Sequence, residues 1–154
     1  MRAGTENVIG IAGLGKAAEL AVQGLPEMDK IRILRDTLEE GIKKLYPEAR
    51  LNGHRTERLP NTLNMCLPGL RGESLVLALD QKGVSLSSGS ACRSGSPKPS
   101  HALLAMGLSE EEAHCSVRLS LGLRNSAEEI DRSVSLFEGV LQDTRGTVRF
   151  IPCR

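Results

Sequence analysis

Cys92 lies in a stretch rich in Ser, Gly and Pro, whose residues 86–99 read LSSGSACRSGSPKP. Such a stretch has little preference for helix or strand and cannot build a core, so it predicts a solvated loop. Apolar runs at 75–79 and 101–106 predict ordered elements on both sides of this loop. A thiol on a loop held in this way is placed to react, whereas a structural cysteine normally has apolar neighbours.

The other three cysteines do not share this setting. Cys66 and Cys115 lie inside apolar, strand-like runs, which predicts that both are buried and inert, and Cys153 lies in the tail. The sequence has no CxxC pair and no histidine at the spacing of a zinc finger, so no metal site is predicted. An even number of cysteines without a secretory signal does not imply disulfides. Cys92 is therefore the candidate nucleophile.

Composition excludes several classes of function. The 154 residues are enough for one domain with a core. Lys and Arg number 20 against 19 Asp and Glu, and aromatic residues make up only 2%, which argues against nucleic-acid binding. No apolar run approaches the roughly 20 residues of a membrane helix, and no signal-peptide pattern opens the chain. We therefore expect a cytoplasmic protein that binds neither nucleic acid nor membranes.

The hydrophobic pattern predicts an α/β fold of the α+β type, with a short, largely antiparallel sheet and helices covering one face. The predicted helices are a glycine-rich one at 8–22, then 28–45, 73–81, 99–106, a capped turn after Ser109, and a last helix after Ser126. The predicted strands are 49–53, 62–67, 84–86 and 116–121. Because residues 117, 119 and 121 are apolar, we expect Arg118 to project from the opposite face, toward the Cys92 loop.

Five short motifs carry a resemblance to a known family. In order they are RAGTEN at 2–7, PNTLN at 60–64, GESL at 72–75, SSGSAC at 87–92 and VRLSLG at 117–122. Together they resemble the C-terminal part of the NifS-type cysteine desulfurases, pyridoxal-phosphate enzymes of the class V aminotransferase group. The resemblance fades after about Gln142, and SSGSAC is its most specific motif. It implies the small C-terminal domain of a fold-type I pyridoxal-phosphate enzyme.

The resemblance also implies roles for three residues. The cysteine at the position of Cys92 takes sulfur from L-cysteine, which leaves L-alanine and a persulfide. That persulfide is passed to acceptor proteins, including those of iron–sulfur cluster assembly. The arginine at the position of Arg118 binds the substrate carboxylate. The threonine at the position of Thr5 reaches across a homodimer to the cofactor phosphate held by the partner subunit.

One expected feature of the family has no counterpart in this sequence. The family binds its cofactor on a lysine, usually beside a histidine, in a large N-terminal domain. The lysines of this chain do not lie in such a context; they are Lys16, Lys30, Lys43, Lys44, Lys82 and Lys98. We therefore expect a fragment or half of a split enzyme, inactive alone. In it, residues 1–154 form one domain, a helix within 1–24 packs on the absent large domain, and 143–154 form a tail.

Two other functions fit parts of the sequence. Residues 92–96 also resemble the sulfur-carrying loop of rhodaneses, but polar or small residues precede Cys92, and Pro97 and Pro99 prevent a helix from starting inside the loop. A module without turnover, which dimerises or docks sulfur acceptors, remains an alternative. His101, His114, Asn61 and Asn64 are expected to be structural.

Overall fold

The structure is a computed structural model that describes residues 4–89 and 99–147. Its elements in chain order are α1 (Val8–Gln23), the 3-10 turn η1 (Leu25–Glu27), α2 (Met28–Leu45), β1 (Arg50–Leu51), β2 (Thr62–Cys66), α3 (Gly72–Asp80), β3 (Ser87–Ser88), α4 (His101–Ala105), α5 (Glu110–His114), β4 (Ser116–Ser120) and α6 (Ala127–Thr147). The strands form one sheet in the order β1-β2-β4-β3, and every pair is antiparallel. The predicted mixed fold with a small antiparallel sheet is confirmed.

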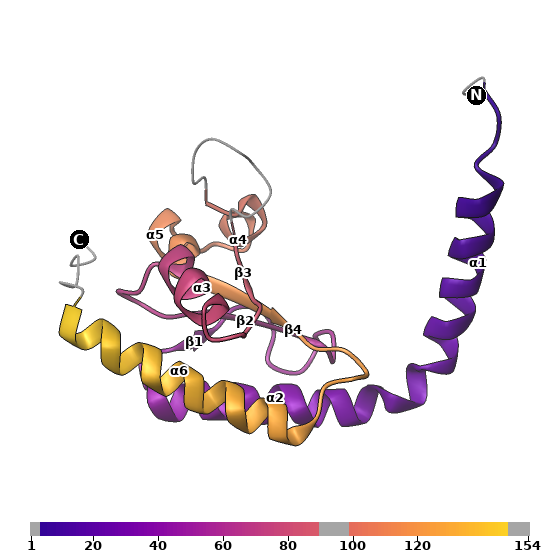
Figure 1. Cartoon of the computed structure of the whole chain (residues 1–154). Coiled ribbons are helices and arrows are strands. Elements are labelled where there is room, and N and C mark those ends of the chain that lie inside the picture. The colour runs from indigo at the N-terminus through magenta and orange to yellow at the C-terminus, as the bar shows by residue number, and fades with distance from the viewer. Residues whose placement is uncertain (1–3, 90–98, 148–154) are drawn as a thin grey trace.

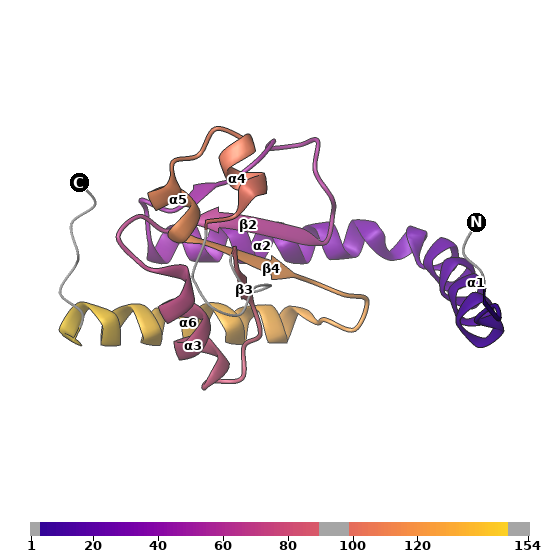
Figure 2. The same ribbon diagram turned by 90° about the horizontal axis from the view of Figure 1, so that it is seen from above.

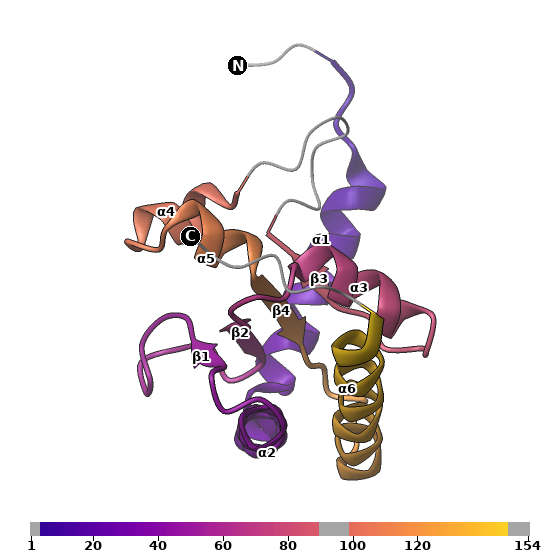
Figure 3. The ribbon, with the colours of Figure 1, turned by 90° about the vertical axis from the view of Figure 1, so that its left-hand side faces the viewer.

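The core lies between one face of this sheet and the two long helices, α2 and α6, which run side by side (Figure 3). Alternation along the strands decides which residues enter it: Leu63 and Met65 of β2 are fully buried, and Val117 and Leu119 of β4 are almost so. The helices contribute apolar residues at helical spacing, which are Ile31, Leu34, Leu38 and Ile42 of α2 and Ile130, Phe137, Val140 and Leu141 of α6. The other residues of each strand therefore face away from α2 and α6.

Gly41 allows α2 and α6 to pack closely. A Cβ atom at this position would lie 2.6 Å from Cγ2 of Val134, a distance at which something must shift. Val134 is β-branched and has few rotamers with which to move aside. The contact between the two helices therefore requires glycine in the middle of α2.

A charged cluster ties the segment before β2 to α2. Arg35 is 4% exposed and donates from Nη1 to the carbonyl oxygen of Leu59, 2.7 Å away. Arg58 donates from Nη2 to Glu39 Oε2 at 2.6 Å and to Asp36 Oδ1 at 3.2 Å. Because each charge has a partner, these side chains can be buried at the edge of the core.

Helix α1 extends away from the rest of the molecule (Figures 1 and 2). It begins where the side chain of Asn7 accepts a hydrogen bond from the backbone N–H of Gly10, and none of its residues is buried. The predicted helix is present, and the surface on which it packs stays a prediction. No single described helix is long and apolar enough to span a membrane; α1 and residues 25–45 would be so only as a pair bent by 46°.

Several element boundaries differ from the sequence-based expectation by a residue or more, and three of these differences lie near the Cys92 segment or the end of the chain. Strand 84–86 was expected, but β3 comprises only Ser87 and Ser88. The backbone of Val84 instead donates to Leu79 O at 2.9 Å and closes the end of α3. Helix α4 begins at His101 rather than at residue 99. Residues 143–147, expected to belong to a tail, continue α6.

Candidate functional site

Arg118 lies in a row of polar residues that crosses three strands. In the antiparallel pairing it is opposite Asn64 of β2 on one side and opposite Ser87 of β3 on the other. Because Val117 and Leu119 are buried, Arg118 projects from the face that α2 and α6 leave open, and it is exposed. No carboxylate among the described residues pairs with its guanidinium. The group is therefore available to an anion.

A pocket of about 320 Å³ lies beside Arg118. Its lining combines polar residues of the sheet side with an apolar wall from α4; these residues are Asn52, Asn64, Ser88, Gly89, Ser100, Ala102, Leu103, Met106 and Arg118. A cation and side-chain amides on one wall and methyl and methylene groups on the other suit a small molecule that carries a carboxylate and an apolar part.

Both ends of the Cys92 loop contribute to this pocket. Residues 90–98, including Cys92, lie outside the described residues, but Gly89 and Ser100 on either side of them line the pocket together with Arg118. These two ends are in close contact, because a Cβ atom at Gly89 would lie 2.8 Å from Cβ of Ser100. The chain thus leaves and returns to the fold at the pocket edge.

Side-chain hydrogen bonds link the pocket to the strands behind it. Asn52 Nδ2 donates to Asn64 Oδ1 at 2.7 Å and to Ser116 Oγ at 2.9 Å. The hydroxyl of Ser116 donates in turn to the carbonyl oxygen of Glu112 at 2.6 Å. The backbone of Asn52 also donates to Asn64 O at 2.9 Å. Asn64 is therefore held by two hydrogen bonds from one residue.

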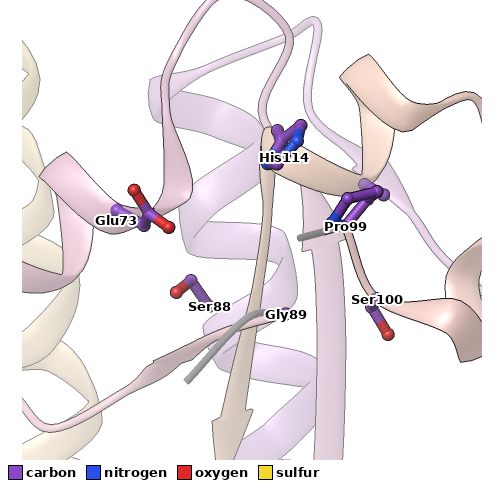
Figure 4. A pocket seen from close by; sticks show the side chains of 7 residues that line it. Glu73, Ser88, Gly89, Pro99, Ser100 and His114 are labelled. Atoms are coloured by element: carbon purple, nitrogen blue, oxygen red, sulfur yellow. The ribbon is translucent and has the colours of Figure 1, made fainter. Parts of the chain in front are cut away.

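A second, smaller space adjoins the pocket on the other side of the loop ends. It holds about 10 Å³, room for one water molecule, and shares Ser88, Gly89 and Ser100 with the larger pocket. Figure 4 shows Glu73, which lies in α3, and His114, the last residue of α5, facing this space from opposite sides. Polar side chains thus surround the loop ends as well as Arg118.

The two described cysteines do not fit the role of nucleophile. Cys66 is 2% exposed and Cys115 is 6% exposed. Burial, and then the neighbouring Cys115 sulfur, raise the pKa of the Cys66 thiol, which disfavours the reactive thiolate. The expected burial of Cys66 and Cys115 is confirmed. Cys153, like Cys92, lies outside the described residues.

Thr5 is not brought to this pocket. It is exposed, it precedes α1, and it is not among the pocket residues. Since α1 leads away from the sheet, residues 4–7 at its start lie far from α4 and β3 (Figure 1). The role that the resemblance implies for Thr5, a contact with the cofactor phosphate across a homodimer, stays a prediction.

Of the two amides in the pocket lining, Asn52 was not predicted from the sequence, and Asn64 was expected to have a structural role only. The alternation around Leu63 and Met65 already placed Asn64 on the polar face of its strand. The pairing of Asn64 with Arg118, and the contact with Asn52, depend on the register between strands distant in sequence. The register between two distant strands cannot be predicted from either strand's own residues.

The described residues do not include a metal site or a lysine in the pocket. No group of three His, Cys, Asp or Glu side chains among them could hold a metal ion. The described lysines lie elsewhere: Lys16 pairs with Glu19 and Lys82 with Asp143, and the pocket lining contains no lysine. The pocket of this chain therefore offers Arg118 as its only described cation.

Comparison with known proteins agrees with this arrangement. The pattern of the family "Aminotransferase class-V" matches residues 1–132. The chain is 47% identical over 152 residues to the cysteine desulfurase IscS of Methanosarcina thermophila, and 44% identical over 146 residues to IscS 1 of Archaeoglobus fulgidus. These alignments cover 98% and 94% of this chain but only 37% and 38% of the relatives. The chain thus spans just over a third of their length.

Solved structures give the same result. A NifS-like protein superposes with a TM-score of 0.78 at 34% identity, covering 92% of this chain and 36% of that structure. A second NifS-like protein, from Rickettsia africae, gives a TM-score of 0.77 at 34% identity with the same coverage. The match of one family pattern to most of the chain, together with these folds, confirms the resemblance that the five motifs carry. The chain belongs to the aminotransferase class-V family and is similar throughout to the NifS-type cysteine desulfurases within it.

Proposed function

We propose that this chain supplies the sulfur-accepting and carboxylate-binding half of a cysteine desulfurase. The observation that carries the proposal is the position of Arg118. Its guanidinium, which no described carboxylate neutralises, lines a pocket whose edge is formed by both ends of the Cys92 loop. The similarity to cysteine desulfurases over 98% of the chain supports the same function.

The proposed reaction converts L-cysteine and the Cys92 thiol into L-alanine and a Cys92 persulfide. The carbon–sulfur bond of the substrate breaks, a sulfur–sulfur bond forms on Cys92, and a proton takes the place of sulfur on the substrate carbon. Only the thiolate of Cys92 is nucleophilic enough to accept the sulfur. A loop whose ends lie at the pocket edge can present one sulfur to the substrate and then to an acceptor protein.

Arg118 is proposed to bind the substrate carboxylate. A guanidinium binds a carboxylate through two parallel hydrogen bonds, which fixes the direction of the rest of the substrate. The apolar wall formed by Leu103 and Met106 lies across the same pocket. The chain therefore orients the substrate from one end while Cys92 reacts at the other.

Pyridoxal phosphate, the cofactor implied by the family, does not fit the described residues alone. Its aldehyde needs a lysine and its ring nitrogen an acidic partner, and the pocket lining contains neither. We propose that these groups belong to a cofactor domain outside the described residues, provided by another chain or by a longer form of this protein. Thr5 would contact the cofactor phosphate across a homodimer, and the persulfide would pass to acceptors that include proteins of iron–sulfur cluster assembly.

A chimeric enzyme tests the proposal. The matching segment of the Methanosarcina thermophila relative is replaced by this chain, and the product is assayed for L-alanine formation from L-cysteine. The chimera is expected to bind pyridoxal phosphate and to form L-alanine, whereas its Cys92→Ser variant is expected to bind the cofactor without forming a persulfide. The purified 154-residue chain is expected to show no turnover.

The competing function is a docking module without catalysis. A chimera that binds pyridoxal phosphate but forms no L-alanine would favour that function and contradict ours. Equal persulfide formation in the Cys92→Ser variant would remove Cys92 from the reaction.

A further inference from the structure

The hydrogen bonds behind the pocket fix the orientation of two side-chain amides. The Ser116 hydroxyl has a single proton and donates it to the carbonyl oxygen of Glu112, so toward Asn52 it can only accept. The group of Asn52 that faces Ser116 must therefore be the donating Nδ2. The partners of Asn52 thus decide which position of its amide is the nitrogen and which is the oxygen.

The orientation of the Asn52 amide also fixes that of the Asn64 amide. Nδ2 of Asn52 has two protons, and the second is donated to Asn64 at 2.7 Å. Asn64 must accept with Oδ1, which leaves its own Nδ2 pointing the other way. No described group accepts the two protons of Asn64 Nδ2, and this atom is not among the enclosed, unpaired polar atoms of the described residues. Asn64 lines the pocket, so these donors open into it.

Asn64 and Arg118 are direct partners across β2 and β4, which places their Cβ atoms about 4.5–5.5 Å apart. Both side chains project from the same face and line the same pocket. An N–H₂ group beside a guanidinium presents only donors to a ligand. Such a pair favours a carboxylate and disfavours an amide or an amine in the same place.

We propose that Asn64 is a second carboxylate-binding residue beside Arg118, and that Asn52, held by Ser116, is the positioning residue that keeps its amide N–H₂ group turned into the pocket. The proposal rests on the proposed function of Arg118 and adds to it. The preference of this pocket for a carboxylate then comes from Arg118 together with the hydrogen-bonded chain of side chains Ser116, Asn52 and Asn64.

Binding of a small carboxylate to the ¹⁵N-labelled chain tests the proposal. Propionate is titrated while the side-chain signals of Arg118, Asn64 and Asn52 are followed by nuclear magnetic resonance, and propionamide serves as the neutral control. Propionate is expected to shift the Arg118 Nε–H and Asn64 N–H₂ signals to saturation, and propionamide is not. Movement of the Asn52 N–H₂ signals without those of Asn64 would overturn the assignment, and this measurement needs no variant.

Two variants of Asn52 separate positioning from mere stability. Asn52→Asp has only acceptors, so it makes the Asn64 amide turn over and point its oxygen at the ligand, whereas Asn52→Ala leaves that amide free to turn. Propionate affinity is therefore expected to fall by about tenfold in Asn52→Asp, and by less in Asn52→Ala. Asn52 lines the pocket, so the negative charge introduced by Asn52→Asp weakens propionate binding by itself, and the deciding signal is that of Asn64. If the Asn64 amide turns over, its N–H₂ signals no longer respond to propionate, whereas repulsion alone leaves that response in place at a weaker affinity; the backbone spectrum checks that folding is equal. Gln81→Ala, an exposed amide away from the pocket, is the matched control.

The outcomes distinguish this inference from the proposed function. If Arg118→Gln leaves propionate binding unchanged, the carboxylate pocket itself is wrong. If Arg118→Gln abolishes binding but Asn64→Ala and Asn52→Asp bind like the parent chain, the arginine role stands and only the role of Asn64 and Asn52 is overturned.

Discussion

Gly89 and Ser100 pack so closely that a Cβ atom on Gly89 would lie 2.8 Å from Cβ of Ser100. These residues bound the segment that carries Cys92, and both line the Arg118 pocket. The contact fixes the distance between the two described residues that flank positions 90–98. The fold therefore holds the two residues that flank the Cys92 segment at the edge of the pocket.

Replacing Gly89 by Ala is expected to push Ser100 away and destabilise the chain by about 1–3 kcal/mol, the usual cost of overpacking. Gly122→Ala is the matched control, because nothing lies within 4 Å of a Cβ at that position. Its effect is expected to stay within about 0.5 kcal/mol. Chemical denaturation of both variants measures the difference. Equal stability of the two would mean that the Gly89 contact does not constrain the loop ends.

Gly41→Ala tests the contact between α2 and α6. Alanine is the better helix former by about 1 kcal/mol, but the clash with Val134 is expected to outweigh this and give a net loss of stability. Gly139→Ala on α6, where a new Cβ meets nothing within 4 Å, is expected to stabilise the chain instead. Adding Val134→Ala to Gly41→Ala should reduce the clash, and a double-mutant cycle measures that coupling.

The charged cluster on α2 predicts a pH dependence of stability. Burial raises the pKa of Glu39, but hydrogen bonds from Lys43 and Arg58 outweigh it, so the pKa of this carboxyl lies below its ordinary value of 4.5. Because the folded pKa is depressed, the stabilisation is complete above pH 4.5 and is lost as the pH falls through the folded pKa. Glu39→Gln is expected to cost about 1–2 kcal/mol at pH 7.

The difference between Glu39→Gln and the parent chain should shrink as the pH falls below 4.5. Glu40→Gln, an exposed neighbour on the same helix, is the control and should have little effect. Urea unfolding between pH 3 and pH 7, read as the free energy of unfolding, makes the comparison. A constant difference across that range would show that the Glu39 charge does not contribute.

Local patterns predicted the parts of this fold that local forces decide. The Ser109-x-x-Glu112 pattern predicted a capping box, and both of its hydrogen bonds are present, at 2.9 and 3.2 Å. The alternation 117–121 predicted β4 and the direction of Arg118, and helical spacing predicted α2. In each case residues close together in the sequence are enough to determine the local structure.

The parts that could not be predicted depend on contacts between distant segments. Asn52 and Ser116 form a hydrogen bond although 64 positions separate them, and only the order β1-β2-β4 brings them together. The clash at Gly41 exists only because α6 packs there. The strand expected at 84–86 failed for the same reason, since pairing with β4 begins only at Ser87. Long-range register, not propensity, decided each of these.

Limited alkylation tests the assignment of Cys92 as the reactive thiol. Cys66 and Cys115 are buried, so both are expected to react slowly with iodoacetamide at neutral pH. In a Cys153→Ser background, mass spectrometry of peptides should find Cys92 labelled first. Unfolding in urea, which exposes every thiol, is the control for equal reactivity. Faster labelling of Cys66 or Cys115 in the folded chain would contradict the assignment.

Arg118→Lys tests the carboxylate clamp in the chimeric enzyme. Lysine keeps the positive charge but loses the two parallel hydrogen bonds of the guanidinium, so kcat/KM for L-cysteine is expected to fall. The loss of one charge-assisted hydrogen bond, about 1.5–3 kcal/mol, corresponds to a drop of roughly tenfold to hundredfold. Because Arg118 is exposed and has no described ion-pair partner, the substitution should leave thermal stability almost unchanged. Arg124→Lys, an exposed arginine beyond β4, is the matched control. A chimera with normal kcat/KM after Arg118→Lys would show that charge alone, or another residue, holds the substrate.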